Sequence, residues 1–479
     1  MIKKLLKYLL KNFSEEQRVV KNSFWLALAR FGGSLLRALL IIYAFRVLGP
    51  SLQGSFSLAM NFILIFSVIP DFGLTAILIR EIIKNQYQKR EIFANAFLAV
   101  SLFLFFSVLI INLSKAFFIK DELAQSLIVI LSLFLIFDVL REFLYALFRA
   151  EERMELQALS HLTTNFLLLI FGIWFLKLNS HPLFLSQAYL LASFFGFLLT
   201  FILLRKELVF NYFKFFQAKV ALDLLNKSWP IGIANFLFLI ITYLDSLVVG
   251  WFHPPKDVGL YSSVVKLTEF LYFFPAALAM SIFPILSKKN NNEFQQTISF
   301  GFQLSLFISL PILGGLLILA KEIIGFIFGP AYLPASLALQ LVSFAIPFNF
   351  LSLILIDALI ALDKRKELLI YDFAIVLINF LLNLIFVPQY SYYASSLITS
   401  ISSLLSLIFS FLILKKYVSL SLKEIKIFNY LLGTILMMVL VYLLPFHLII
   451  KIIFGALFYF LLLFILKDPF LLRLKKHSF

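Results

Sequence analysis

The sequence has no cysteine, and only 14% of its 479 residues are charged. Without cysteine there can be no disulfide, no thiolate chemistry and no metal site with Cys ligands. The five histidines are scattered and show no spacing typical of paired metal ligands. These absences leave no support for redox or metal chemistry.

Common enzyme motifs are also missing. The sequence has no phosphate-binding GxxxxGK[ST], so we expect no ATP hydrolysis, and it has neither HExxH nor GxSxG. We therefore expect a protein that is not an enzyme and has no cofactor. Transport remains, driven by a gradient of H+ or Na+, by the membrane potential or by the substrate gradient.

Long apolar runs recur from end to end, and 62% of the residues are hydrophobic. A run of about 20 apolar residues is long enough to cross a bilayer as a helix. This pattern predicts an all-α polytopic membrane protein with fourteen transmembrane helices. The expected spans are 22–48, 52–79, 92–113, 123–148, 156–177, 184–204, 228–251, 258–286, 294–319, 334–362, 368–387, 392–414, 427–445 and 452–466.

The positive charge follows the membrane topology. The net charge of +16 would suggest nucleic acid in a soluble protein, but here the basic residues lie in short loops. Thirty of the 41 Lys and Arg fall on the side that holds the N-terminus, and six on the other. Basic loops stay in the cytoplasm, so we expect a plasma-membrane protein with both termini cytoplasmic and no nucleic-acid partner.

A weak internal repeat divides the spans. Gln53-Gly54-Ser55-Phe56-Ser57 and Val258-Gly259-Leu260-Tyr261-Ser262 are 205 residues apart. Arg153-Met154-Glu155-Leu156 and Arg365-Lys366-Glu367-Leu368 are 212 apart, and each precedes a span with an Asn, Asn165 or Asn379. A unit of six spans keeps its orientation, which predicts two parallel lobes related by a pseudo-two-fold along the membrane normal, facing a central cleft.

The predicted domains follow from this repeat. Residues 1–21 form a basic cytoplasmic N-terminus, either an amphipathic helix on the membrane surface or a frayed tail. The N-lobe is 22–206, the inter-lobe linker is 207–227 and the C-lobe is 228–416. Residues 417–479 hold the last two spans and a basic tail.

Two arginines lie inside the first span. Arg30 and Arg37 are seven residues apart and share one helical stripe, whereas Arg46 points about 180° away from Arg37. An Arg at the centre of a membrane helix costs about 2.5–3.5 kcal/mol. Either these arginines pair with acids on neighbouring helices, or they line an anion-binding cavity.

Other ionisable residues within spans are candidates for cavity or coupling roles. Asp245 has no basic neighbour at helical spacing, so it is a candidate for a coupling ion or for a pair with Arg30 or Arg37. Lys266 and Glu269 are spaced for a local ion pair, as are Asp138 and Arg141. Arg141 and Glu142 are adjacent, face different ways and are expected to need other partners. The remaining candidates are Asp71 and Asp357.

The chain resembles the polysaccharide-biosynthesis flippases of the O-antigen type, within the multidrug/oligosaccharidyl-lipid/polysaccharide exporter superfamily. The resemblance covers about residues 20–420. It is carried by the order and spacing of several short segments: Arg46-Val47-Leu48-Gly49-Pro50, Asp71-Phe72-Gly73-Leu74, Tyr243-Leu244-Asp245-Ser246, Val258-Gly259-Leu260-Tyr261-Ser262, Phe283-Pro284 and Phe328-Gly329-Pro330-Ala331-Tyr332.

The resemblance implies two six-helix lobes around a cavity, and flipping of an undecaprenyl-pyrophosphate-linked oligosaccharide to the outer leaflet by alternating access. Its partners would be that substrate, membrane lipids and glycan polymerase or assembly proteins. The anionic pyrophosphate would suit Arg30 and Arg37. Two alternatives stay open: a cation-coupled multidrug exporter of the same fold, and a lipid II flippase.

Overall fold

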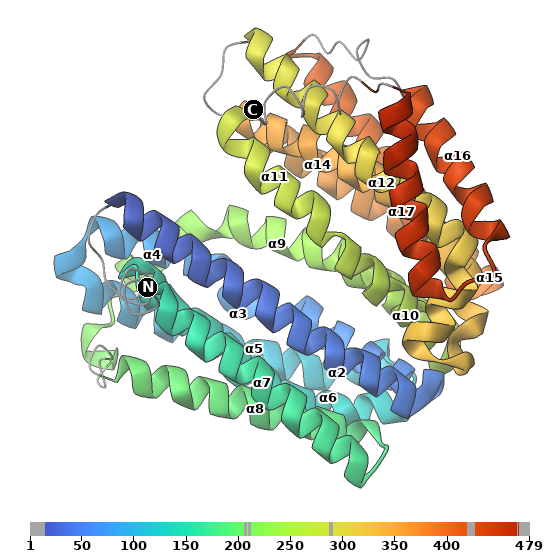
Figure 1. Cartoon of the computed structure of the whole chain (residues 1–479). Coiled ribbons are helices and arrows are strands. Elements are labelled where there is room, and N and C mark those ends of the chain that lie inside the picture. Colours follow the sequence, from blue (N-terminus) through green and yellow to red (C-terminus); the bar gives the residue numbers. More distant parts are fainter. Residues whose placement is uncertain are drawn as a thin grey trace, which may run out of the picture. The chain divides into compact units, whose positions relative to one another are not determined.

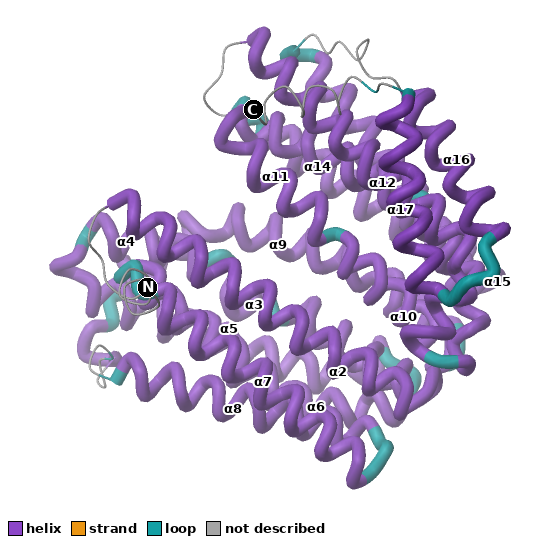
Figure 2. Tube along the Cα trace, viewed as in Figure 1, coloured by secondary structure: helices purple, strands orange, loops and turns teal. Residues whose placement is uncertain are grey.

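The computed structural model describes residues 15–205, 208, 212–286, 291–418, 427–466 and 468. Figure 2 shows helices joined by short loops, and the described residues contain no strand. The chain is an all-α, multi-pass membrane protein. Its helices group into two compact units, residues 1–259 and 260–479.

The first unit contains helices on both sides of the predicted linker (Figure 1). Its elements are α2 (Glu15–Phe66), α3 (Val68–Asp71), α4 (Leu74–Lys84), η1 (Gln86–Gln88), α5 (Lys89–Phe118), α6 (Glu122–Ala150), α7 (Met154–Leu178), α8 (Pro182–Leu204), η2 (Tyr212–Phe215), α9 (Ala218–Phe252) and the start of α10 (Pro255–Leu271).

The second unit takes the rest of α10 and the C-terminal helices. Its elements are α11 (Phe273–Leu286), α12 (Asn291–Phe328), η3 (Pro330–Ala335), α13 (Ser336–Ser343), α14 (Ala345–Ala361), α15 (Arg365–Lys415), α16 (Ile427–Leu443) and α17 (Leu448–Ile465).

The described helices are consistent with fourteen crossings. Eleven stretches are long and apolar enough to cross a membrane, and α16 is a shorter apolar helix. Two of the eleven are long enough to cross twice, and each is broken where the sequence predicts a loop. In α2 the break is at Gly49, whose φ is 69°; in α15 it is at Ser391, whose φ is 50°. Both positive φ values interrupt the helical hydrogen bonding.

The two compact units divide between residues 259 and 260, which is not one of the predicted domain boundaries. Helix α9, which should open the C-lobe, packs with the first unit, against α2, α4 and α5. The second half of the predicted linker is ordered: η2 is followed by the first residues of α9, and the buried Asn95 bonds both ways with the backbone at Phe215 and Gln217. The lobe division based on the repeat stays a prediction.

The predicted terminal segments are described only in part. The first fourteen residues of the N-terminal segment lie outside the described residues, and so does the basic tail apart from Asp468. Residues 15–21 form the first turns of α2. There Arg18 pairs with Glu152 at 3.0 Å, and the buried Lys21 pairs with Glu155 at 3.1 Å. The start of α2 is thereby fixed to the turn between α6 and α7.

The repeat is visible in backbone geometry. The turn from α6 to α7 has Glu152 at φ 56°, and the turn from α14 to α15 has Asp363 at φ 58°. Each turn is closed by an equivalent backbone hydrogen bond over five residues, from Arg153 N to Phe148 O and from Lys364 N to Leu359 O. These are Schellman-type helix ends. They repeat at an offset of 211, one residue less than the tetrapeptide match.

The repeated motif that contains Gly54 and Gly259 forms a reciprocal contact. A Cβ on Gly54 would lie 1.7 Å from the Pro255 carbonyl oxygen, and a Cβ on Gly259 would lie 1.9 Å from the Pro50 carbonyl oxygen. Gly54 and Gly259 are 205 residues apart in the sequence, and so are Pro50 and Pro255. The contact between backbones is so close that only glycine fits at both positions.

The span after Gly49 is interrupted near its end. Pro70 has no N–H to donate to the carbonyl of Phe66, four residues earlier. The buried Ser107 of α5 donates to this oxygen instead, at 3.0 Å. An equivalent break occurs at Tyr272, three residues before Pro275, just as Ser67 lies three before Pro70.

We expect Gly54→Ala and Gly259→Ala each to lower the stability of the purified protein by about 1–3 kcal/mol or more, because the new methyl group overlaps a backbone carbonyl. Thermal unfolding in detergent, followed by tryptophan fluorescence, measures the loss. Gly315→Ala is the matched control, since nothing lies within 4 Å of its Cβ position. An unchanged melting temperature for both tight variants would contradict the contact.

We expect Ser107→Ala to destabilise the protein by about 1 kcal/mol, because the Phe66 carbonyl loses its donor in apolar surroundings. Ser114→Ala on the same helix is the control, because the Ser114 hydroxyl only bonds the Ile110 carbonyl of its own helix. Equal melting temperatures for the two variants would show that Ser107 does not serve this carbonyl.

Candidate functional site

The predicted arginine stripe of α2 faces α7. Arg30, Gly33 and Arg37 share one side of the helix, and α7 packs extensively along α2. A Cβ on Gly33 would lie 2.7 Å from Nε2 of His161, and one on Gly32 would lie 2.9 Å from a methyl group of Leu162. The two glycines therefore let α7 approach closely, as small residues do between membrane helices.

Arg37 is held by a neutral side chain. Its Nε and Nη2 donate to Oδ1 of Asn165, at 3.3 Å and 3.1 Å. Asn165 is buried, and its Nδ2 donates to the carbonyl of His161 at 2.8 Å. Arg37 itself is exposed. One edge of the guanidinium is thus fixed by an amide, which cannot neutralise its charge.

Neither Arg30 nor Arg37 forms an ion pair with a carboxylate in the described part of the chain. Arg30 is exposed on α2. The predicted pairing with acids of neighbouring helices is therefore not seen at these two residues. Their role as an anion site stays a prediction.

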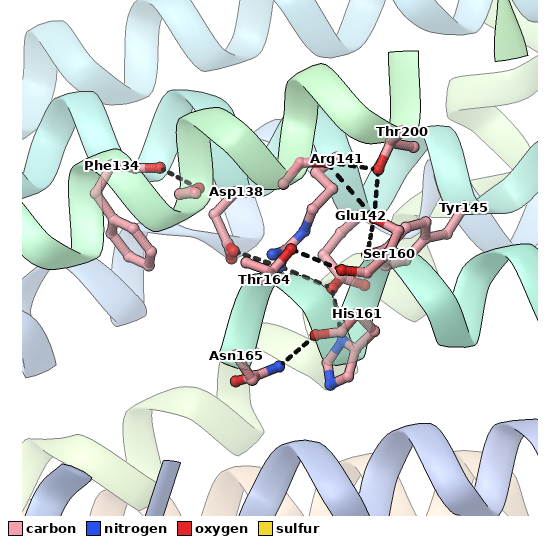
Figure 3. Close-up of polar contacts among 12 residues, drawn as sticks. Phe134, Asp138, Arg141, Glu142, Tyr145, Ser160, His161, Thr164, Asn165 and Thr200 are labelled. Atoms are coloured by element: carbon pink, nitrogen blue, oxygen red, sulfur yellow. Dashed lines mark hydrogen bonds and ion pairs between the residues drawn. The ribbon is translucent and has the colours of Figure 1, made fainter. Parts of the chain in front are cut away.

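Arg141 of α6 is bound very differently. It is buried, and its Nη2 lies 2.6 Å from Oδ1 of Asp138 and 3.2 Å from Oε1 of Glu142 (Figure 3). Its guanidinium lies 5.7 Å from the ring centroid of Tyr145. The predicted local pair with Asp138 is confirmed. The expectation that Arg141 and Glu142 need other partners is wrong, because the long Arg side chain reaches the carboxylate of its neighbour.

The Arg141 cluster adjoins the face of α7 that carries Asn165. His161 Nδ1 is 4.0 Å from Oε1 of Glu142. Figure 3 shows His161 and Asn165 one turn apart on the same helix. Two carboxylates, one buried arginine, one imidazole and the Asn165-bound Arg37 therefore occupy adjacent positions on α6, α7 and α2.

A hydroxyl network fixes α7 from behind. Tyr145 OH donates to Ser160 Oγ at 3.0 Å, and Ser160 Oγ lies 2.6 Å from Thr200 Oγ1. These buried contacts link α6, α7 and α8 (Figure 3). They fix the rotation of α7 and with it the direction in which His161 and Asn165 project.

Two predicted residues of the first unit lie on helices other than α2, α6 and α7. Asp71 accepts from the backbone N–H groups of Gly73 and Thr75, at 3.2 Å and 3.0 Å, and so caps the start of α4. Asp245 is buried on α9. The geometry gives Asp71 a structural task at the broken helix, and a coupling role for Asp245 stays a prediction.

The other predicted residues lie in the second unit. Lys266 Nζ is 2.8 Å from Oε2 of Glu269, so these residues form the expected local pair. Asp357 is half-buried on α14. No group of three or more His, Cys, Asp or Glu that could hold a metal ion occurs among the described residues.

Sequence reasoning missed the partner of Arg37. Asn165 drew notice only as a polar residue in a span that follows a repeated tetrapeptide. An amide in an apolar helix needs a hydrogen-bond partner, and this need marks Asn165 as a candidate contact residue. The partner lies 128 residues away in the sequence, so pattern alone could not name it.

Two models of known protein families match the chain. The model described as "Polysaccharide biosynthesis protein" matches residues 19–290. A second model, MatE, matches residues 230–385. The first match includes every helix of the Arg37 and Arg141 clusters and covers more than half of the chain.

Two curated relatives come from Haloferax volcanii. The probable low-salt glycan biosynthesis flippase Agl15 is 26% identical over 188 residues, which are 38% of this chain and 40% of that protein. The probable flippase AglR is 22% identical over 184 residues, 37% of this chain and 38% of that protein. The chain thus matches about two fifths of the length of each relative.

A solved structure of the lipid II flippase MurJ, in an inward closed conformation, has the same fold. Its TM-score is 0.78 at 18% identity, with 92% of this chain and 99% of that chain covered. Together with the family match, this likeness agrees with the all-α architecture predicted from the apolar runs. The protein belongs to the polysaccharide biosynthesis protein family, within the multidrug/oligosaccharidyl-lipid/polysaccharide exporter superfamily.

Proposed function

We propose that this protein is a flippase that moves a lipid-linked oligosaccharide from the cytoplasmic to the outer leaflet of the plasma membrane by alternating access. The substrate is an oligosaccharide joined through pyrophosphate to a polyprenyl lipid such as undecaprenol. The observation that carries the proposal is Arg37: a charged, exposed guanidinium within an apolar helix, held by the amide of Asn165. The names of the two probable flippases support the same function.

The chemistry of such a substrate fits the residues. The planar fork of arginine matches two phosphate oxygens at once, which a lysine does not. Arg30 and Arg37 lie about 10 Å apart along α2, at about 1.5 Å per residue. They would serve as successive contacts for a pyrophosphate that enters from the cytoplasm, while the lipid tail stays in the bilayer.

The wider setting follows from the same proposal. Both termini are cytoplasmic, and the protein acts as a transporter with no catalytic step and no cofactor. An H+ or Na+ gradient drives the cycle, with Asp245 and Asp357 as coupling candidates. The partners are membrane lipids, the lipid-linked glycan and proteins that assemble it, such as a glycan polymerase.

We expect Arg30→Ala and Arg37→Ala each to reduce flipping of a pyrophosphate-linked glycolipid at least about tenfold, because each removes charge-assisted hydrogen bonds worth about 1.5–3 kcal/mol. Flipping is measured in proteoliposomes by accessibility of the fluorescently labelled glycan to an external quencher. Membrane abundance of each variant is measured in parallel.

Arg46→Ala is the matched control on the same helix. Arg46 is also exposed on α2 but lies off the stripe of Arg30 and Arg37, so we expect flipping to persist. Full flipping by the Arg30 and Arg37 variants at normal abundance would remove the proposed site.

Complementation separates the candidate substrates. We expect the gene to restore surface polysaccharide in a strain that lacks its polysaccharide flippase, and not to restore growth of a strain that lacks its lipid II flippase. The reverse pattern would assign lipid II as the substrate, and export of cationic dyes without either rescue would assign multidrug transport.

A further inference from the structure

We propose that Asn165 is the positioning residue that prepares Arg37 for a pyrophosphate, and that its lack of charge makes the site selective for anions. This inference rests on the proposed function, because it concerns the same site. It adds a residue of α7 to a site that the sequence places on α2 alone.

Asn165 fixes both the place and the direction of the Arg37 guanidinium. Its Oδ1 accepts from Nε and Nη2, so it contacts one edge of the planar group. A guanidinium has five N–H groups, and two of them point to Asn165. The other three remain for a ligand, and Arg37 is exposed.

Asn165 is itself held in one orientation. Its Nδ2 donates to the carbonyl of His161 at 2.8 Å, so its Oδ1 is the end directed at Arg37. Asn165 is 2% exposed, which leaves no room for its amide to turn toward solvent. Gly33 brings α2 and α7 close at this level, because its missing Cβ leaves the space that His161 and Asn165 occupy.

The nearby Arg141 shows what a charged partner does. Asp138 and Glu142 both contact its Nη2, and the residue is buried. An arginine paired in this way has its charge compensated by carboxylates. The neutral amide holds one edge of Arg37 by two hydrogen bonds and leaves its charge available to a bound anion.

The same site would therefore fail with aspartate in place of Asn165. Asp has the same shape as Asn but carries a negative charge, so it would form an ion pair with Arg37. An arriving pyrophosphate would have to displace that carboxylate. Asn165→Asp separates the neutrality of the partner from its size.

The test uses the full-length purified protein and farnesyl pyrophosphate as the probe, with farnesol to subtract binding of the lipid tail. We expect Asn165→Asp to weaken pyrophosphate-dependent binding at least about tenfold, the loss equivalent to one charge-assisted contact. Asn165→Ala, which removes the acceptor without adding charge, should cause a smaller loss. Isothermal titration calorimetry gives both dissociation constants.

A double-mutant cycle tests whether Asn165 acts through Arg37. In an Arg37→Ala background, Asn165→Asp and Asn165→Ala should change binding by less than about twofold, because the group that they orient is gone. A purely structural role would reduce binding equally in both backgrounds, and that result would overturn the inference. If the Asn165→Asp variant misfolds, the cycle is run with Asn165→Ala alone. A size-exclusion profile like that of the wild type shows that this variant is folded.

The outcomes separate this inference from the proposed function. If Arg37→Ala weakens binding and both Asn165 variants bind as the wild type does, only the role of Asn165 is overturned. If the wild type shows no pyrophosphate-dependent binding, the proposed site is wrong and this inference falls with it. Asn112→Asp is the matched control. Asn112 lies in a different span, α5, where its amide donates to the Val108 carbonyl and to Ser132. The Asn112→Asp variant should bind farnesyl pyrophosphate as the wild type does.

Discussion

Charged and polar groups inside an apolar helix need partners, and this requirement shapes the first unit of the protein. Arg141 meets it with two carboxylates and becomes buried. Arg37 meets it with one amide and stays exposed. An ion in hydrocarbon is costly, and the two arginines meet this cost with different partners. Arg141 is a structural element of α6, and Arg37 keeps a charge that a ligand can use.

Backbone groups obey the same requirement. Pro70 leaves the Phe66 carbonyl without its helical donor, and Ser107 of another helix supplies one. Glycines allow close packing for a related purpose: Gly54 and Gly259 let two backbone segments touch, and Gly33 leaves space for the side chains of His161 and Asn165. The breaks and close contacts recur at offsets of 205 to 211 residues, as expected when the two halves of a chain descend from one unit.

Much of the fold could be predicted from the sequence. Apolar runs located the spans, and turn residues located the breaks, as Gly49-Pro50 did in α2. Local pairs such as Lys266 with Glu269 followed from helical spacing. The start of α9 was missed because residues 218–227 are too polar to appear as a span, although they continue the same helix. The contact of Arg141 with Glu142 was missed because spacing rules describe where side chains leave the helix, and not how far a long side chain reaches.

The sequence by itself determined that this is a polytopic helical membrane protein with arginines on one stripe of its first span. Hydropathy and helical periodicity are local properties, so they can be read along the chain. Only the tertiary structure decided that Arg37 meets Asn165 while Arg141 meets Asp138 and Glu142. The choice between an amide and a carboxylate depends on which faces of α2, α6 and α7 pack together. That packing is set by glycines and buried hydroxyls distributed over more than a hundred residues.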